Sequence, residues 1–342
     1  MSRKPLTATL VLVFATACTV APTGTETSRI DEASFIPIGG IDQWVTIRGD
    51  NRSNPILLHV HGGPGFAFSA FTNEFASYEA DFTVVQWDQR GAGRTFGRYG
   101  EDTPEVTLDR IARDGIELAG YLEDHLGKRK IILLGHSIGS IAATEMVRSA
   151  PERFAVYVGT GQFANFEGLV DGQLIYLRDV AEATGDADLV AQLVEIGTID
   201  PEGLAQFFAI NRTLFSHLPA AEAAFAQSFL QSRPAEAMTP AELADWQGGA
   251  EASRDWIMPQ VRQVDLFATT QRLEVPVIVI HGSDDIYTPT ESTIAYFEHI
   301  DAPVKELVIV EGAGHFPHLT HTEQFLAALL ETARPIAIAN GG

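Results

Sequence analysis

Lys130-Ile-Ile-Leu-Leu-Gly-His-Ser-Ile-Gly-Ser-Ile-Ala-Ala-Thr-Glu-Met-Val147 carries the strongest structural signal in this 342-residue sequence. Its apolar run at 131–134 is typical of a buried strand, and the apolar positions that follow from Ile141 have helical spacing. Between them stands the pattern Gly-x-Ser-x-Gly. A sharp strand-to-helix turn holds such a serine in a strained backbone conformation, and the small residues on either side let neighbouring segments pass closely. The context predicts Ser137 as a nucleophile.

Further short apolar runs alternate with helical patterns along the rest of the chain. Residues 108–122 place their apolar side chains on one stripe of a helix. Phe35-Ile-Pro-Ile38 and Trp44-Val-Thr-Ile47 flank Gly39-Gly40 and predict a β-hairpin. Buried strands that alternate with helices predict an α/β fold with a mostly parallel central sheet and helices on both faces. The other predicted strands are 56–60, 82–87, 156–158, 275–280 and 307–310.

The pattern changes between the strands at 156–158 and 275–280. This stretch is rich in Ala, Gln, Glu and Phe and has helical spacing without a convincing strand. A helical insertion at this point of a parallel sheet predicts a cap over the carboxyl ends of the strands, where ligands bind. We therefore predict a core formed by residues 35–160 and 266–338, with a helical cap formed by residues 161–265.

The N-terminus has the pattern of an export signal. Met1-Ser-Arg-Lys-Pro5 is basic, an uncharged apolar stretch follows, and Ala15-Thr-Ala17 precedes Cys18. This predicts a signal peptide at 1–17 and a flexible tether at 18–34. Cys18 resembles the lipobox cysteine of bacterial lipoproteins, which implies lipid attachment there and a cell envelope location, in the outer membrane or periplasm. Membrane contact would then occur only through this anchor. Ordinary secretion and an uncleaved cytoplasmic N-terminus are the alternatives.

Composition and charge limit the classes of molecule that this protein is expected to bind. The hydrophobic fraction of 45% is sufficient for a large buried core. The formal net charge of −22 disfavours nucleic acid, because a phosphate backbone would repel it. The single cysteine excludes an intrachain disulfide framework and a thiolate-rich metal site. We expect a small-molecule or short-peptide substrate, and the sequence does not indicate an oligomeric state.

A glycine-rich loop provides candidate oxyanion donors. His61-Gly-Gly-Pro-Gly65 directly follows the strand at 56–60. Acyl transfer needs fixed N–H groups aimed at the oxygen that becomes negative, and glycines let backbone amides approach it closely. We assign the two donors to the backbone N–H groups of Gly63 and Ile138.

A nucleophilic serine also needs a base and an acid that orients the base. The chain order expected after a Gly-x-Ser-x-Gly turn of this kind is serine, acid, histidine. The loop after the strand at 275–280 offers Asp284 and Asp285, and the loop after the last strand offers His315. Order and placement therefore both agree with a catalytic triad.

Two other motifs suggest different chemistry. The spacing of His315, His318 and His321 could hold a metal, but no acidic or cysteine partner accompanies it, so we predict no metal. Gly91-Ala-Gly-Arg-Thr-Phe-Gly97 partly matches a dinucleotide fingerprint, but no amphipathic helix follows it. The remaining histidines near these loops, at 59, 136 and 281, are expected to pack in the core.

Together these features resemble the prolyl iminopeptidase-like (prolyl aminopeptidase) serine hydrolases of the α/β-hydrolase superfamily. The resemblance covers roughly residues 35–335. It rests on HGGPG from His61, on Trp87-Asp-Gln-Arg-Gly-Ala-Gly-Arg-Thr95, on the serine turn, and on Gly314-His315. It implies an α/β-hydrolase fold with an inserted helical cap, a Ser-His-Asp triad, and neither a metal nor an organic cofactor.

The resemblance also bears on individual residues. The family's acid stands three residues after the loop glycine, Gly282 here, which implies Asp285 over Asp284. The family's turn is typically Gly-Gly-Ser-Trp-Gly-Ser, whereas this chain has Gly-His-Ser-Ile-Gly-Ser. Its caps carry a Trp-Glu pair whose glutamate holds the substrate's amino group, and neither Trp246 nor Trp256 is followed by glutamate. Available cap glutamates include those at 167, 202 and 222.

These observations lead to one main hypothesis and two alternatives. The main hypothesis is a serine hydrolase of the prolyl iminopeptidase type that cleaves a peptide or amide bond through an acyl-enzyme. Ser137 attacks, His315 acts as base and then as acid, and Asp285 orients His315. A carboxylesterase or lactonase with the same triad is the alternative enzyme. The non-enzyme alternative is an inactive surface binding protein.

Overall fold

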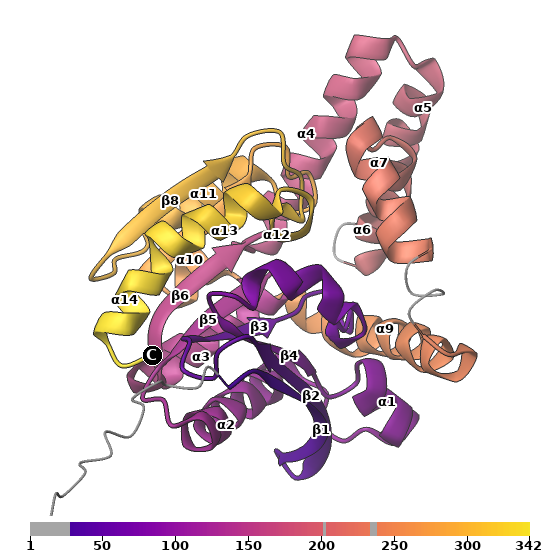
Figure 1. The fold of residues 1–342 in the computed structure, drawn as a ribbon. Coiled ribbons are helices and arrows are strands. Elements are labelled where there is room, and N and C mark those ends of the chain that lie inside the picture. Colours follow the sequence, from indigo (N-terminus) through magenta and orange to yellow (C-terminus); the bar gives the residue numbers. More distant parts are fainter. Residues whose placement is uncertain (1–27, 201–202, 233–237) are drawn as a thin grey trace, which may run out of the picture.

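A computed structural model describes residues 28–200, 203–232 and 238–342 and contains one eight-stranded sheet (Figure 1). The strand order is β1-β2-β4-β3-β5-β6-β7-β8. β1 and β2 form an antiparallel hairpin and β2 pairs antiparallel with β4, whereas all other pairings are parallel. The expected mostly parallel α/β sheet is thus confirmed. The strands are β1 Ile30–Ile38, β2 Ile41–Gly49, β3 Ile56–Val60, β4 Thr83–Asp88, β5 Ile131–His136, β6 Phe154–Thr160, β7 Val277–Gly282 and β8 Lys305–Val310.

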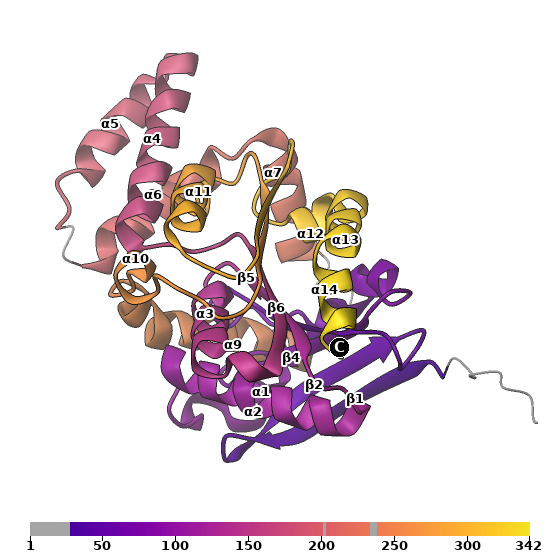
Figure 2. The same ribbon diagram turned by 90° about the vertical axis from the view of Figure 1, so that its left-hand side faces the viewer.

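Helices cover both faces of the sheet, as Figures 1 and 2 show from two directions. One face packs against α2, α3, α9 and α11, and the other packs against η1, α13 and α14. The bounds outside the β6–β7 connection are η1 Ser69–Tyr78, α1 Gly93–Tyr99, η2 Gly100–Asp102, α2 Leu108–Leu126, α3 Gly139–Ser149, η3 Pro151–Arg153, α11 Thr290–His299, α12 Pro317–Thr320, α13 Thr322–Glu331 and α14 Ala333–Ala339.

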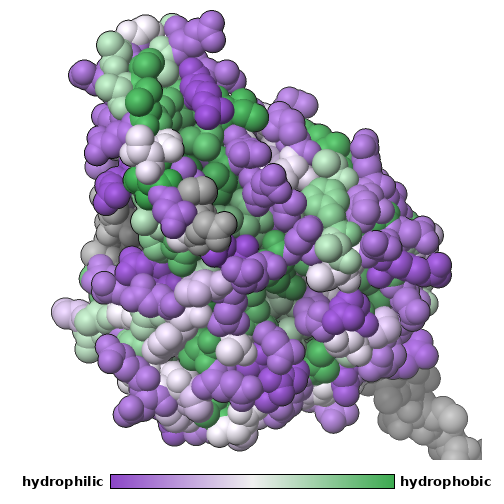
Figure 3. All heavy atoms as spheres, turned by 180° about the vertical axis from the view of Figure 1, so that it is seen from behind, coloured by the Kyte–Doolittle hydropathy of each residue, from purple (hydrophilic) through white to green (hydrophobic). Residues whose placement is uncertain are grey.

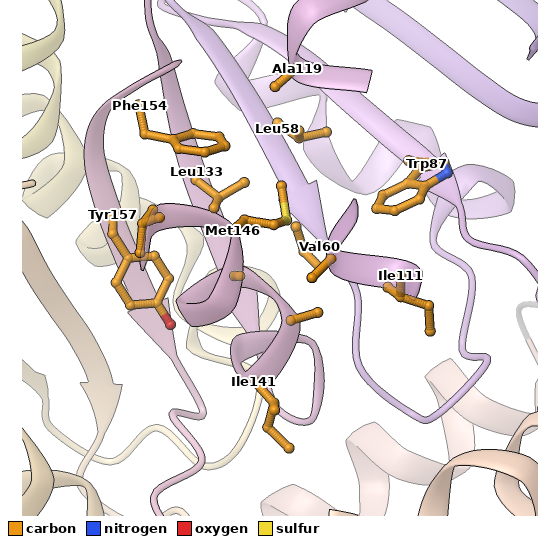
Figure 4. Packing of buried hydrophobic residues seen from close by; sticks show 14 of the residues in the cluster. Leu58, Val60, Trp87, Ile111, Ala119, Leu133, Ile141, Met146, Phe154 and Tyr157 are labelled. Atoms are coloured by element: carbon orange, nitrogen blue, oxygen red, sulfur yellow. The ribbon is translucent and has the colours of Figure 1, made fainter. Parts of the chain in front are cut away.

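The central strands are buried on both faces, because their alternate side chains enter two different cores. In β5, Ile131 and Leu133 belong to the core beneath α2 and α3, whereas Ile132 and Leu134 belong to the core beneath η1 and α13. Figure 4 shows Met146 of α3 among the side chains of the first of these cores. This double burial explains why the strands appear in the sequence as continuous apolar runs.

Helix α2 illustrates how local sequence signals determine where a helix begins and ends. Thr107 caps its N-terminus by accepting a hydrogen bond from the backbone N–H of Arg110, and Gly127 ends it in a left-handed conformation. Its glycine at position 115 lets the helix approach α3 closely, because an added Cβ would lie 2.6 Å from the Met146 side chain. The predicted helix at 108–122 is confirmed and continues for one further turn.

Between β6 and β7 the described residues form helices only, apart from isolated bridging residues. These inserted helices are α4 Phe166–Thr184, α5 Ala187–Ile196, α6 Leu204–Ser216, α7 Ala220–Ala226, the π-helical η4 Gln227–Ser232, α9 Pro240–Val261 and α10 Leu266–Thr269. Helices α4 and α5 project away from the sheet in Figure 2. They share a small core that includes Leu177, Leu189 and Ile210.

The projecting helices also carry exposed apolar side chains. Figure 3 shows a largely hydrophilic face with hydrophobic residues gathered on the projecting part of the molecule. Val194 is 67% exposed and Ile175 is 55% exposed. The predicted boundaries of the cap, 161 and 265, fall in the connections just after β6 and just before α10.

The N-terminal prediction needs one correction. The predicted tether at 18–34 overlaps β1, which begins at Ile30 and pairs with β2 from Gly49 onward. Ile30 is only 3% exposed, so backbone pairing and burial hold a segment whose composition suggested a flexible linker. The predicted signal peptide and Cys18 lie outside the described residues. In the described part of the chain, no helix is both long and apolar enough to span a bilayer.

Candidate functional site

Ser137 lies in the turn between β5 and α3, as the motif predicts. Its φ of 56° makes it, with Glu105, one of two non-glycine residues at positive φ among the described residues. The glycines around it permit this turn. A Cβ on Gly139 would lie 2.4 Å from the carbonyl oxygens of Val60 and His61, and one on Gly135 would lie 2.7 Å from the Ala143 side chain. The Gly-rich loop after β3 therefore packs directly against the serine turn.

The three predicted triad side chains lie within hydrogen-bonding distance of one another. His315 Nε2 is 2.9 Å from Ser137 Oγ, and His315 Nδ1 is 2.8 Å from Asp285 Oδ2. Asp285 and His315 are only 4% and 5% exposed. Asp284 points elsewhere, because its carboxylate accepts a hydrogen bond from the Ser283 hydroxyl. Of the two aspartates, the structure therefore brings Asp285 to the histidine.

Asp285 is held by further donors from its own loop. The backbone N–H groups of Tyr287 and Thr288 donate to Oδ1, each at 2.9 Å, and the Thr288 hydroxyl donates to Oδ2 at 2.8 Å. Burial alone would raise the pKa of Asp285, but the charge and hydrogen bond of His315, with His281 and the Thr288 N–H, hold it below its ordinary value. The side chain is thus an oriented carboxylate.

The two predicted oxyanion donors flank the serine. Gly63 and Ile138 line the same cavity as Ser137 and His315. Within the described residues, neither backbone N–H donates a hydrogen bond to another protein group. Ile138 also immediately precedes α3, so the positive end of that helix faces the serine turn. The arrangement leaves two donors available to a negatively charged oxygen near Ser137.

The cavity at Ser137 has a volume of about 220 Å³ and is mostly apolar. The inserted helices contribute Leu169, Gln173, Phe207, Asn211 and Phe215 to its wall. The described residues that line it include no carboxylate. Its other lining residues are Gly62, Gly63, Phe66, Phe68, His136, Ser137, Ile138, Tyr287, Thr288, His315 and Phe316.

The cap glutamates named from the sequence do not line this cavity. Glu222 lies close to the histidine loop, where its carboxylate would meet a Cβ added to Gly314, and its charge acts on His315 and Asp285. Burial raises the pKa of Glu222. Glu167 lines a second, larger cavity of about 910 Å³, which contains Asp285 but neither Ser137 nor His315. Glu202 lies outside the described residues.

Three buried histidines converge beneath the serine turn. His59, His136 and His318 form the group of described residues whose side chains could hold a metal ion, with donor nitrogens within 4.8 Å of one another. Neither His315 nor His321 is a member. His136 Nε2 lies 3.1 Å from the His315 carbonyl oxygen, so it reaches the histidine loop. The predicted buried packing of His59, His136 and His281 is confirmed.

Several lining residues carry no recognisable signal in the sequence. Gln173, Asn211 and Phe215 come from inserted helices, and Tyr287 and Thr288 come from the loop that follows β7. Each lies on a helix or loop whose local pattern indicates only a helix or a turn. The contact between the Thr288 hydroxyl and Asp285 appears only in the structure.

Comparison with known proteins gives the following matches. The model of a family described as "Alpha/beta hydrolase family" matches residues 57–328. "Probable aminopeptidase YbaC" of Bacillus subtilis is 26% identical over 306 residues, which cover 87% of this chain and 95% of that protein. "Putative carbamate hydrolase RutD" of Escherichia coli is 24% identical over 275 residues, covering 80% and 85%. "Proline iminopeptidase" of Clostridioides difficile is 24% identical over 304 residues, covering 87% and 96%.

A solved structure has the same fold. The proline iminopeptidase-related protein of Thermus thermophilus superposes with a TM-score of 0.59 at 22% sequence identity. The superposition covers 90% of this chain and 99% of that one. At this identity the likeness concerns the fold alone.

Proposed function

Because the chain belongs to the alpha/beta hydrolase family, we propose that it is a serine hydrolase whose nucleophile is Ser137. The observation that carries the proposal is the continuous hydrogen-bonded arrangement from Ser137 Oγ through His315 to Asp285. A histidine so placed can take the serine proton, and a carboxylate at its other nitrogen fixes the tautomer that does so.

The proposed reaction proceeds through an acyl-enzyme. Ser137 Oγ attacks the carbonyl carbon of the substrate while His315 Nε2 accepts the hydroxyl proton. The backbone N–H groups of Gly63 and Ile138 stabilise the oxyanion, and His315 then protonates the leaving group. Water, activated by the same histidine, hydrolyses the acyl-enzyme and restores Ser137. The strained backbone at Ser137 supports this role, since it presents Oγ at the end of the strand.

The lining of the cavity favours an uncharged acyl substrate. A free ammonium group buried beside Ser137 would need an anionic partner, because an unpaired buried charge is costly. The described lining residues of this cavity include no carboxylate. An ester or amide with a neutral, mainly apolar acyl part therefore suits the cavity, which makes carboxylesterase or amidase activity the first candidate.

An aminopeptidase of the prolyl iminopeptidase type is the second candidate. The similarity to proteins named as an aminopeptidase and a proline iminopeptidase supports it. Such an enzyme needs an anionic partner for the ammonium group of its substrate. Among the described glutamates, Glu222 is the best candidate, since its charge acts on His315, Asp285 and Tyr287. Because Glu222 does not line the cavity at Ser137, its surroundings would have to move for its carboxylate to contact a substrate amine there.

The two candidates differ in one measurable ratio. We would compare kcat/KM for p-nitrophenyl butyrate with kcat/KM for proline p-nitroanilide, using Ser137→Ala as the blank. We expect the ester to be the better substrate and the Ser137→Ala protein to lose turnover while retaining its fold by circular dichroism. A fluorophosphonate probe should label the wild-type protein only.

Each outcome has a definite meaning. Preference for the prolyl anilide would favour the aminopeptidase, and Glu222→Gln should then raise its KM. Undiminished turnover by Ser137→Ala would overturn the assignment of the nucleophile. A folded wild-type protein that neither reacts with the probe nor hydrolyses any ester would favour the inactive binding protein.

A further inference from the structure

The inserted helices contribute one polar pair to the otherwise apolar part of the cavity wall. Gln173 comes from α4 and Asn211 comes from α6, and both line the cavity that contains Ser137. Gln173 is 1% exposed, and its Nε2 donates to the Tyr287 carbonyl oxygen at 3.2 Å. The pair therefore connects the inserted helices to the loop that carries Asp285.

The hydrogen bonds determine which atom of Asn211 is left for a ligand. Its Nδ2 donates to the Phe207 carbonyl oxygen at 2.9 Å and is 3.4 Å from Gln173 Oε1. The opposite amide orientation would place Oδ1 against two acceptors, so the network selects this one. Within the described residues, Asn211 Oδ1 accepts no hydrogen bond. A neutral acceptor thus remains at the cavity wall.

We infer that Asn211 Oδ1 recognises an uncharged hydrogen-bond donor on the acyl part of the substrate, a hydroxyl or an amide N–H. This inference rests on the proposed serine hydrolase. A carbonyl oxygen pairs with a neutral donor without a counter-charge, whereas the described lining residues supply no carboxylate for an ammonium group. The substrate class is therefore a hydroxylated or amide-bearing acyl ester or amide, mainly apolar elsewhere.

Asn211 should allow the protein to distinguish a substrate that carries a hydrogen-bond donor from an analogue that lacks it. Phe207 and Phe215 line the same wall, so the surroundings of Asn211 are mainly apolar, although Asn211 itself is only partly buried. A substrate that supplies the donor gains a hydrogen bond that its plain analogue lacks. A net gain of about 1 kcal/mol for one such bond corresponds to roughly a fivefold preference, and a better-shielded bond gives more.

The test compares matched esters on the intact protein. We would measure kcat/KM for p-nitrophenyl butyrate and for the 3-hydroxy and 4-hydroxy analogues, with 3-aminobutyrate as the charged counterpart. We expect at least one hydroxy ester to exceed butyrate by about fivefold or more. Asn211→Leu, which keeps the size but removes the acceptor, should lower that ratio to near unity.

Controls separate this inference from the proposed function. Asn73→Leu alters an exposed asparagine outside the cavity and should leave the ratio as in the wild type. Fluorophosphonate labelling of Asn211→Leu verifies that its triad is assembled, and Asn211→Ala offers a smaller replacement, also without an acceptor, if leucine prevents folding. Failure of the wild-type protein to react with the probe would contradict the proposed serine hydrolase function itself.

Three results with a reactive triad would overturn the inference alone. These are no preference for any hydroxy ester, a preference that survives in both Asn211 variants, and a stronger preference for the amino ester than for either hydroxy ester. The last result would indicate an ammonium site and so return attention to the aminopeptidase.

Discussion

Asp285 shows how the surroundings of a residue set the orientation and the charge of its side chain. Three donors from the adjacent backbone and Thr288 surround its carboxylate, and His315 approaches from the opposite loop. The neighbouring residue Asp284 is exposed, and its carboxylate accepts a hydrogen bond from the adjacent Ser283 hydroxyl. Two adjacent carboxylates therefore differ in their suitability for catalysis. The difference comes from how deeply each is buried and from its hydrogen-bond partners.

This contrast predicts the effect of paired substitutions. Asp285→Asn should lower kcat/KM for an ester by roughly three to four orders of magnitude, because an amide favours the wrong tautomer of His315. Asp284→Asn removes the same charge one residue away and should retain activity within about twofold, since exposed substitutions away from such features have small effects. Steady-state kinetics with p-nitrophenyl butyrate measures both. Equal losses in the two variants would show that Asp285 has no special role.

The turn between β5 and α3 depends on the absence of a side chain at Gly139. Strand β5 ends at His136 and helix α3 begins at Gly139, so only Ser137 and Ile138 lie between them. The loop after β3 passes against this turn, where any Cβ on Gly139 would strike two backbone carbonyls. Backbone atoms cannot move aside as a flexible side chain can. The closeness of the two loops is what brings Gly63 beside Ser137.

Gly139→Ala should therefore destabilise the protein by about 1–3 kcal/mol, the usual cost of overpacking a tight site. Gly203→Ala is the matched control, because the nearest atom to its added Cβ is 3.9 Å away and its φ is negative. Urea unfolding curves give the free energy of unfolding for both variants. A Gly139→Ala protein as stable as the control would mean that the turn can relax without strain.

At the scale of the whole molecule, the fold buries several neutral histidines near the carboxyl ends of its strands. Burial lowers the pKa of His59 to about 4 and that of His61 to about 3, from an ordinary value near 6.5. It also lowers the pKa values of His136, His281 and His318. At these five positions the folded protein thus binds fewer protons than the unfolded chain below pH 6.5, which outweighs the single opposite contribution of similar size from Asp88, whose pKa burial raises to about 6.

The free energy of unfolding should consequently fall as the pH decreases. The contribution of these histidines to stability is fully present above about pH 6.5 and is lost progressively down to their folded pKa values, because in that range only the unfolded histidines become protonated. Each such histidine contributes a slope of up to about 1.4 kcal/mol per pH unit. His59→Gln should reduce the slope measured by urea unfolding between pH 6.5 and 4.5, because it removes one of the buried histidines with a lowered pKa. An unchanged slope in His59→Gln would contradict the assignment.

Part of the candidate site could be predicted because it follows local patterns in chain order. Apolar runs mark the strands, and each catalytic candidate lies just after one of them. The carboxyl ends of parallel strands meet at one edge of a sheet, so these loops converge even when they are distant in sequence. Residues alone left Asp284 and Asp285 open, and family resemblance favoured Asp285. The tether was wrong over residues 30–34, because composition does not reveal pairing with β2.

Periodicity, turn chemistry and chain order were sufficient to predict the sheet, the inserted helices and the candidates Ser137, His315 and either Asp284 or Asp285. The cavity at Ser137, in contrast, could not be predicted before the helices were seen packed together. Ser137 and His315 meet across 178 positions, and Asn211 meets Gln173 across 38. The first pair follows from sheet order, but the second depends on the angle at which α4 and α6 pack. No local pattern encodes that angle, because many side-chain contacts set it together.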